Sequence, residues 1–193
     1  MKVALIAVVV LVVLALLVGG AYVSTKNQLV TLNETVNSKW AQVNVVLERR
    51  SDLIPNLVQT VKGFAAQEQT VYDDIDKARA ALGGARTPSD KIAANGQLDG
   101  ALSRLLVVVE NYPQLRSNEN FLRLQDELAG TENRIAVERK NYNDSIQAYN
   151  TFIGQFPNSI FARWAGFKRN DAYFAAPAAA QQVPQVQFPG PNR

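Results

Sequence analysis

The sequence predicts an all-α protein, in which an N-terminal transmembrane helix is followed by an elongated antiparallel (up-and-down) bundle of three to four long helices. Three observations support this prediction. A block of apolar residues opens the chain, apolar residues then recur every seven positions, and no segment shows the alternation of a half-buried strand. We divide the chain into an anchor (1–25), a bundle (26–156), an aromatic and basic segment (157–175) and a tail rich in Pro, Ala and Gln (176–193).

The anchor is predicted from residues 3–23, which contain no charged side chain. A helix of this length spans about 30 Å, the thickness of a hydrocarbon core. Lys2 and Lys26 flank the block, and Tyr22 stands where an interfacial aromatic residue is favoured. The small residues 19–21 would also suit the cleavage site of a signal peptide. Because the block is longer than a usual signal core and helical patterning resumes after Lys26, we favour an uncleaved anchor.

The region 26–84 predicts a long helical stretch that Gly83-Gly84 ends. Two series with seven-residue spacing form an apolar stripe, as in a coiled coil, which other helices must cover. The first series contains Trp40, Leu47, Ile54, Val61, Glu68, Ile75 and Leu82, and the second contains Val36, Val43, Arg50, Leu57, Phe64, Val71 and Ala78.

Pro55 interrupts this stretch, because proline removes one backbone hydrogen bond and clashes with the preceding turn. Two interpretations remain open. The region is one helix kinked at Pro55, or Ser51 and Asp52 cap a new helix with Pro55 in its first turn.

Two further helices follow. Residues 87–90, Thr-Pro-Ser-Asp, form a start signal with a capping Thr, a Pro at the first helical position and a carboxylate in the first turn. This helix is expected to end before Pro113. The next one is expected to begin at Ser117 or Asn118 and to run to about Phe156. Its seven-residue series contains Phe121, Leu128, Ile135, Tyr142 and Tyr149.

Aromatic rings crowd the segment 152–174, interleaved with basic residues. The rings could close the end of the bundle, or they could lie among lipid headgroups, where such mixtures are favoured. A chain broken near Ser51 would return Phe156 to the membrane, whereas a merely kinked first helix would leave it far away. Beyond Ala175 the composition predicts disorder unless neighbouring surfaces hold the tail.

The chain has neither His nor Cys. This excludes disulfides and removes the usual metal ligands and catalytic bases. The formal net charge of +3 comes without a basic run, so a nucleic-acid partner is not expected. We predict a protein that is not an enzyme, with no catalytic residues, no cofactor and no metal. A site made only of carboxylates stays open as an alternative.

Polar residues on or beside the apolar series are interpreted as buried layers that fix helix register. Glu68, Glu132 and Glu138 would pair there with arginines or asparagines, for example Arg50 and Arg134. Residues 49–56 suit a helix junction, with a docking surface as the alternative. The structural or interaction candidates are Arg50, Asp52, Pro55, Asn56, Glu68, Glu110, Tyr112, Pro113, Glu132, Arg134, Glu138 and Trp164.

Several separate blocks, in order, resemble the LemA family. They include Trp40, residues 49–58 (RRSDLIPNLV), 110–113 (ENYP), 131–136 (TENRIA), Tyr142-Asn143, Tyr149-Asn150 and Phe156-Pro157. The resemblance runs from the anchor to about Phe174. It implies a single-pass bacterial membrane protein with a helical bundle, no established enzymatic activity and no catalytic residues to carry over. Family members are often discussed beside membrane metalloproteases.

We therefore predict a membrane-anchored, non-enzymatic structural or scaffolding protein that self-assembles through its helices. The alternative is a monomeric adaptor or sensor that presents its bundle to a membrane-protein partner such as a protease. The expected partners are the lipid bilayer and further copies of the chain. The expected location is the bacterial inner membrane. The bundle is placed on the extracytoplasmic side, although Lys2, Lys26 and Lys39 do not fix the orientation.

Overall fold

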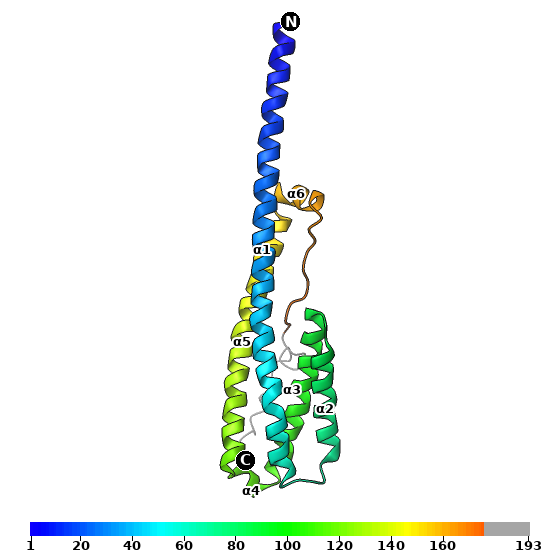
Figure 1. Ribbon diagram of the computed structural model, residues 1–193, viewed down its shortest axis with the longest axis vertical. Coiled ribbons are helices and arrows are strands. Elements are labelled where there is room, and N and C mark those ends of the chain that lie inside the picture. The colour runs from blue at the N-terminus through cyan, green and yellow to red at the C-terminus, as the bar shows by residue number, and fades with distance from the viewer. Residues whose placement is uncertain (176–193) are drawn as a thin grey trace, which may run out of the picture.

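The computed structural model describes residues 1–175, and every regular element in that range is a helix. Predictions for residues 176–193 lie outside the described residues. The helices are α1 (Lys2–Lys62), α2 (Gln69–Gly84), α3 (Pro88–Glu110), α4 (Pro113–Arg116), α5 (Glu119–Gly154) and α6 (Asn158–Trp164). Figure 1 shows α1 as a long rod whose N-terminal part projects beyond the bundle. The predicted all-α class is confirmed.

Helix α1 passes through Pro55 without a break, so the interpretation with a new helix starting near Ser51 is wrong. The missing backbone hydrogen bond at proline normally weakens a helix. Here Ile54, Leu57 and Val58 are all buried, which holds α1 together on both sides of the proline. The N-terminal part of α1 is the one segment among residues 1–175 long and apolar enough to cross a membrane, and none of it is buried.

The chain reverses instead at residues 63–68, so the prediction of one helical stretch up to residue 84 is also wrong. The backbone N–H groups of Gly63 and Ala65 donate to carbonyls in the last turn of α1, and the Tyr72 hydroxyl donates to the Ala65 carbonyl at 2.8 Å. Val61 of α1 and Ile75 of α2 are both fully buried, but on different helices. The seven-residue spacing that links them across the turn is therefore a coincidence.

The caps predicted for the later helices are present. Thr87 accepts a hydrogen bond from the Asp90 N–H at 3.1 Å at the start of α3. Asn118 accepts one from the Phe121 N–H at 3.1 Å at the start of α5. Both bonds satisfy backbone groups that the first turn of a helix leaves free.

The core has two sections. The distal section, farther from the N-terminus, combines α2, α3, α4, the end of α1 and the start of α5 around residues such as Ile54, Leu98 and Phe121. The proximal section lies between α1 and α5, around Leu29 and Tyr142. Because α2 and α3 reach only the distal half of α1 (Figure 1), another element must cover the proximal half.

That element is the segment 167–175, which we call the strap. It leaves α6 at Gly166, whose φ of 80° is a conformation that glycine adopts readily, and runs back along the bundle (Figure 1). Phe167, Tyr173 and Phe174 pack against the proximal core. Two long helices thus gain a third covering layer from a chain segment that is not helical.

Asparagine side chains hold the strap by its backbone. Asn143 accepts from the Phe174 N–H at 3.0 Å and donates to the Phe174 carbonyl at 2.9 Å. Asn150 binds Asn170 in the same way, at 2.9 and 2.6 Å. The Tyr149 hydroxyl donates to the Lys168 carbonyl at 2.7 Å. Because Asn143 and Asn150 are seven residues apart, they lie on one face of α5.

We predict opposite effects for two buried tyrosines of α5. The Tyr142 hydroxyl has no hydrogen-bond partner among residues 1–175, whereas that of Tyr149 binds the strap. Tyr149→Phe should lower the free energy of unfolding by about 1 kcal/mol, and Tyr142→Phe should leave it unchanged or raise it. Urea unfolding of the full chain in detergent, followed by circular dichroism, measures both. An equal loss in Tyr142→Phe would contradict this hydrogen-bond assignment.

The same tyrosines predict a dependence on alkaline pH. Burial raises the pKa of Tyr142 and Tyr149 above the ordinary value of 10.0. The folded state therefore favours the neutral phenols. Their contribution to stability is fully present below about pH 10 and is lost as pH rises through the higher folded pKa. The double variant Tyr142→Phe/Tyr149→Phe should lose less stability than the parent between about pH 8 and pH 11, measured by the same urea titration.

Candidate functional site

A polar layer lies between the two sections of the core. At its centre is Arg50 of α1, which is only 7% exposed although it carries a full charge. Its neighbours along the stripe are Leu47, in the proximal section, and Ile54, in the distal section. A guanidinium at this depth requires compensating charge and hydrogen bonds.

Side chains from α3 and α5 supply that compensation. Arg50 forms an ion pair and hydrogen bond with Asp99, and its Nη1 lies 3.0 Å from Glu132 Oε2. The contact with Glu132 is an ion pair only, since Glu132 Oε2 has no hydrogen-bond partner among residues 1–175. The buried Asn95 accepts from Arg50 at 3.4 Å and donates to Asp99 Oδ2 at 3.1 Å.

Arg139 completes the layer and joins it to the strap. Its Nη2 lies 3.5 Å from Asp99 Oδ2, and its guanidinium carbon lies 5.0 Å from the centre of the Phe174 ring. The same ring packs edge-on against Tyr142, with ring centres 6.0 Å apart. Two guanidinium groups therefore face two carboxylates, and the layer is formally neutral. An ion pair and a cation–π contact share one arginine, so the strap and the helix-joining layer support each other.

The chemistry of this layer favours a structural role. Both carboxylates face arginine, and the surrounding groups offer no free base. Within residues 1–175, no three acidic side chains come together in a way that could hold a metal ion. Charged groups that must meet their partners do fix the register of packed helices.

The structure brings some of the predicted site residues together and separates others. Arg50 meets Glu132, and the Tyr112 hydroxyl lies 3.5 Å from Glu68 Oε1 at the distal end of the bundle. Glu138 accepts a hydrogen bond from Asn141 on its own helix instead of joining a layer between helices. The remaining candidates lie on the surface or at helix ends: Asp52, Asn56, Glu110, Arg134 and Trp164 are exposed, Pro55 lies inside α1, and Pro113 begins α4.

Sequence reasoning missed Asn95 and Asp99. The signal was present but weak. The two residues are four apart, so they share one face of a helix, and Asp99 directly follows the buried Leu98. This spacing could have marked them as a polar pair on the buried side of a helix, but it does not say which helix they face.

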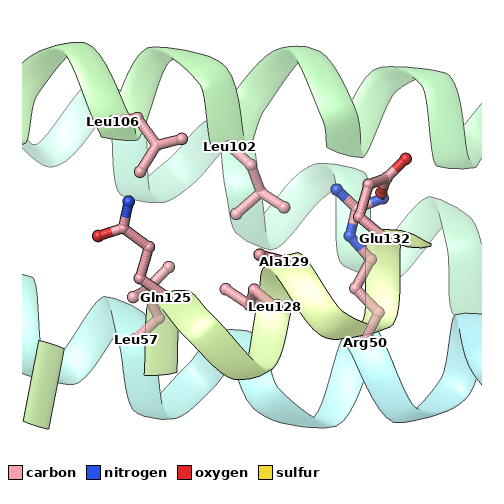
Figure 2. Close-up of a pocket in the computed structure, with 8 residues that line it drawn as sticks. All are labelled: Arg50, Leu57, Leu102, Leu106, Gln125, Leu128, Ala129 and Glu132. Atoms are coloured by element: carbon pink, nitrogen blue, oxygen red, sulfur yellow. The ribbon is translucent and has the colours of Figure 1, made fainter. Parts of the chain in front are cut away.

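An apolar groove adjoins the polar layer. It has a volume of about 230 Å³ and is lined by residues of α1, α3 and α5. Figure 2 shows Leu102 and Leu106 of α3 facing Leu128 of α5, with Arg50 and Glu132 side by side at one end. The groove is open on one side, so it presents aliphatic side chains where α3 and α5 do not close on each other.

We predict that Arg50→Met lowers the free energy of unfolding by about 2 kcal/mol, because its charge-assisted hydrogen bonds are lost and the buried Asn95 Oδ1 is left without its donor. Arg49→Met is a matched control, since Arg49 is exposed and should change stability by less than about 0.5 kcal/mol. Urea unfolding of the full chain in detergent measures both. Equal effects in the two variants would show that the layer contributes nothing specific.

Comparison with known proteins places the chain in a family. The model of the LemA family matches residues 39–188, which begins after the anchor and extends past Phe174, where the resemblance was expected to end. Magnetosome protein MamQ 2 from Paramagnetospirillum magneticum is 28% identical, with 87% of this chain and 73% of that protein covered. Magnetosome protein MamQ from Magnetospirillum gryphiswaldense is 27% identical (83% and 69% covered). Protein LemA from Metamycoplasma hominis is 21% identical (86% and 74% covered). With more than half of its length matched by the family model, this chain belongs to the LemA family.

Proposed function

We propose that the chain is a membrane-anchored, non-enzymatic structural protein that assembles with copies of itself on the membrane. The continuity of α1 is the observation that supports this most. One helix of 61 residues contains both the candidate membrane span and the core residues from Leu29 to Val61. It is about 90 Å long, and no linker separates span from bundle.

A continuous helix has a consequence for neighbouring copies. Each bundle stands in a fixed orientation to its own span, so the groove between α3 and α5 lies at the same distance from the span in every copy. Anchoring confines the copies to two dimensions and raises their effective concentration. A weak apolar contact between grooves can then form without any high-affinity surface.

The groove and its surroundings offer such a contact. Leu106, which is 42% exposed, lines the groove. Together with Leu122, which is 44% exposed, it also lines a second hollow. Covering these side chains removes apolar surface from water. The polar layer at the end of the groove would limit how far a second copy could slide along it.

The names of the family and of the relatives specify no reaction, which fits a role without catalysis. In this proposed function the chain crosses a bacterial inner membrane once, and the bundle lies on the extracytoplasmic side. The alternative, an adaptor for another membrane protein such as a protease, would use the same groove for a different chain.

Cysteine crosslinking tests this proposal, because the chain has no cysteine of its own. Ala129 is exposed and lines the groove, whereas Glu127 is exposed on the same helix about 200° around its axis. In native membranes, Ala129→Cys should form disulfide-linked dimers on mild oxidation, and Glu127→Cys should not. Electrophoresis without reductant measures both.

Two outcomes would overturn self-assembly through the groove. Equal dimer formation by both variants would indicate random collision in the membrane plane. A product of Ala129→Cys with a different protein, in place of the dimer, would favour the adaptor.

A further inference from the structure

Large apolar side chains remain exposed at the corner formed by the end of α5 and by α6. Phe156 is 82% exposed, Trp164 67% and Ile160 41%. Ile160 and Trp164 are four residues apart, so they share one face of α6. Bundle packing does not account for this face, because none of these three side chains is buried.

The buried side chains of α6 account for its position. Phe161 and Ala162 are buried, and the Phe161 ring packs edge-on against Tyr22 of α1 with ring centres 6.1 Å apart. The Thr25 hydroxyl donates to Asn158 Oδ1 at 3.4 Å. These contacts fix α6 to α1. The Trp164 ring packs edge-on against Phe161, with ring centres 5.8 Å apart, and the rest of its surface is exposed.

The place of attachment is informative. Tyr22 and Thr25 lie where the apolar run of α1 ends at Val23, three residues before Lys26. Figure 1 shows α6 beside α1 at the end of the bundle from which only α1 continues. Any bilayer that contains the apolar part of α1 therefore begins at the level of α6.

Basic residues near this corner suit the depth of lipid headgroups. Arg163 precedes Trp164 in α6, and Lys168 lies at the start of the strap; both are exposed. Arg169 is paired with Asp171 at 2.6 Å and is less available. Tryptophan and phenylalanine with nearby basic residues are favoured at the depth of lipid headgroups, where the rings are shielded from water and the cations meet phosphates.

We propose that the corner 156–164 is a second membrane contact, with Phe156, Ile160 and Trp164 inserted among the lipid headgroups of the bilayer that α1 crosses. This inference rests on the membrane anchor of the proposed function and is independent of self-assembly. Two attachment points on one rigid body fix its tilt. The bundle then stands at a defined angle to the membrane, whereas a single helix alone would let it rock.

Tryptophan fluorescence tests the contact, because the chain has only two tryptophans. In Trp40→Phe, Trp164 is the sole emitter. The full chain is reconstituted into vesicles of phosphatidylcholine and phosphatidylglycerol whose acyl chains carry bromine either near the headgroup or near the methyl end. We expect shallow bromine to quench Trp164 strongly, deep bromine to quench it weakly, and iodide in the buffer to quench it little.

Two matched variants in the background Trp40→Phe/Trp164→Phe complete the design. Leu11→Trp places the emitter inside the span, and deep bromine should quench it. Val107→Trp places it at a position of similar exposure, 63%, near the distal end of α3, and no bromine should quench it. Quenching of Val107→Trp as strongly as Trp164 would mean that the whole bundle lies on the membrane, and it would overturn the proposal.

The remaining outcomes separate the two proposals. If Leu11→Trp is quenched and Trp164 is not, the anchor stands and the second contact is refuted. If Leu11→Trp escapes quenching, the anchor itself fails. A Trp164 shielded from iodide but untouched by bromine would be covered by protein, which also refutes the lipid contact. A nitroxide on Ile160→Cys, in the otherwise unchanged chain, reports the same depth and keeps the test valid if Trp40→Phe disturbs the fold.

Discussion

The apolar stripe of α1 sets the requirement that the rest of the structure meets. Apart from Arg50, one side of the helix is apolar from Leu29 to Val61, and a surface of that length must be covered along its whole extent. Helix α5 covers it along most of its length. The hairpin of α2 and α3 is too short to reach the proximal half, so the strap takes its place there. The two sections of the core thus cover two parts of the same apolar stripe with different elements.

The polar layer lies where covering by the strap ends and covering by α2 and α3 begins. Arg50 follows the end of the proximal section, and its carboxylate partners come from α3 and α5. A leucine at position 50 would bury more apolar surface, but it would take one cation from Asp99 and Glu132 and the donor from Asn95 Oδ1. The layer therefore aligns three helices at one height. The layer also contacts the strap, because Arg139 lies over the Phe174 ring.

The sequence was sufficient for the features that depend on local chemistry. The caps at Thr87 and Asn118 and the apolar series of α5 follow from residue type and spacing alone. The reversal at residues 63–68 was missed, because Gly63 is its only strong turn residue and the seven-residue spacing continues across it. That error had a further effect. The return of Phe156 toward the N-terminal end of α1 was expected only if the helix broke near Ser51. The chain achieves it with the later reversal and the added hairpin.

Contacts between distant parts of the chain were harder to predict. Nothing in the spacing of Asn95 and Asp99 says which helix will face them, since that depends on the lengths of α2 and α3. The strap was likewise recognisable as aromatic but not as extended chain. The Tyr-Asn pairs at 142–143 and 149–150 mark the face of α5 that holds it, and their meaning becomes clear only with the bound backbone in place.

The way in which α5 grips the strap has an evolutionary consequence. Asn143 and Asn150 bind main-chain N–H and C=O groups, which every residue except proline possesses. Between its aromatic residues, the strap can therefore drift in sequence while its path stays the same. The strict demand falls on the two asparagines, and on the exclusion of proline from positions 170 and 174. Related chains can differ widely in this segment and still follow one course.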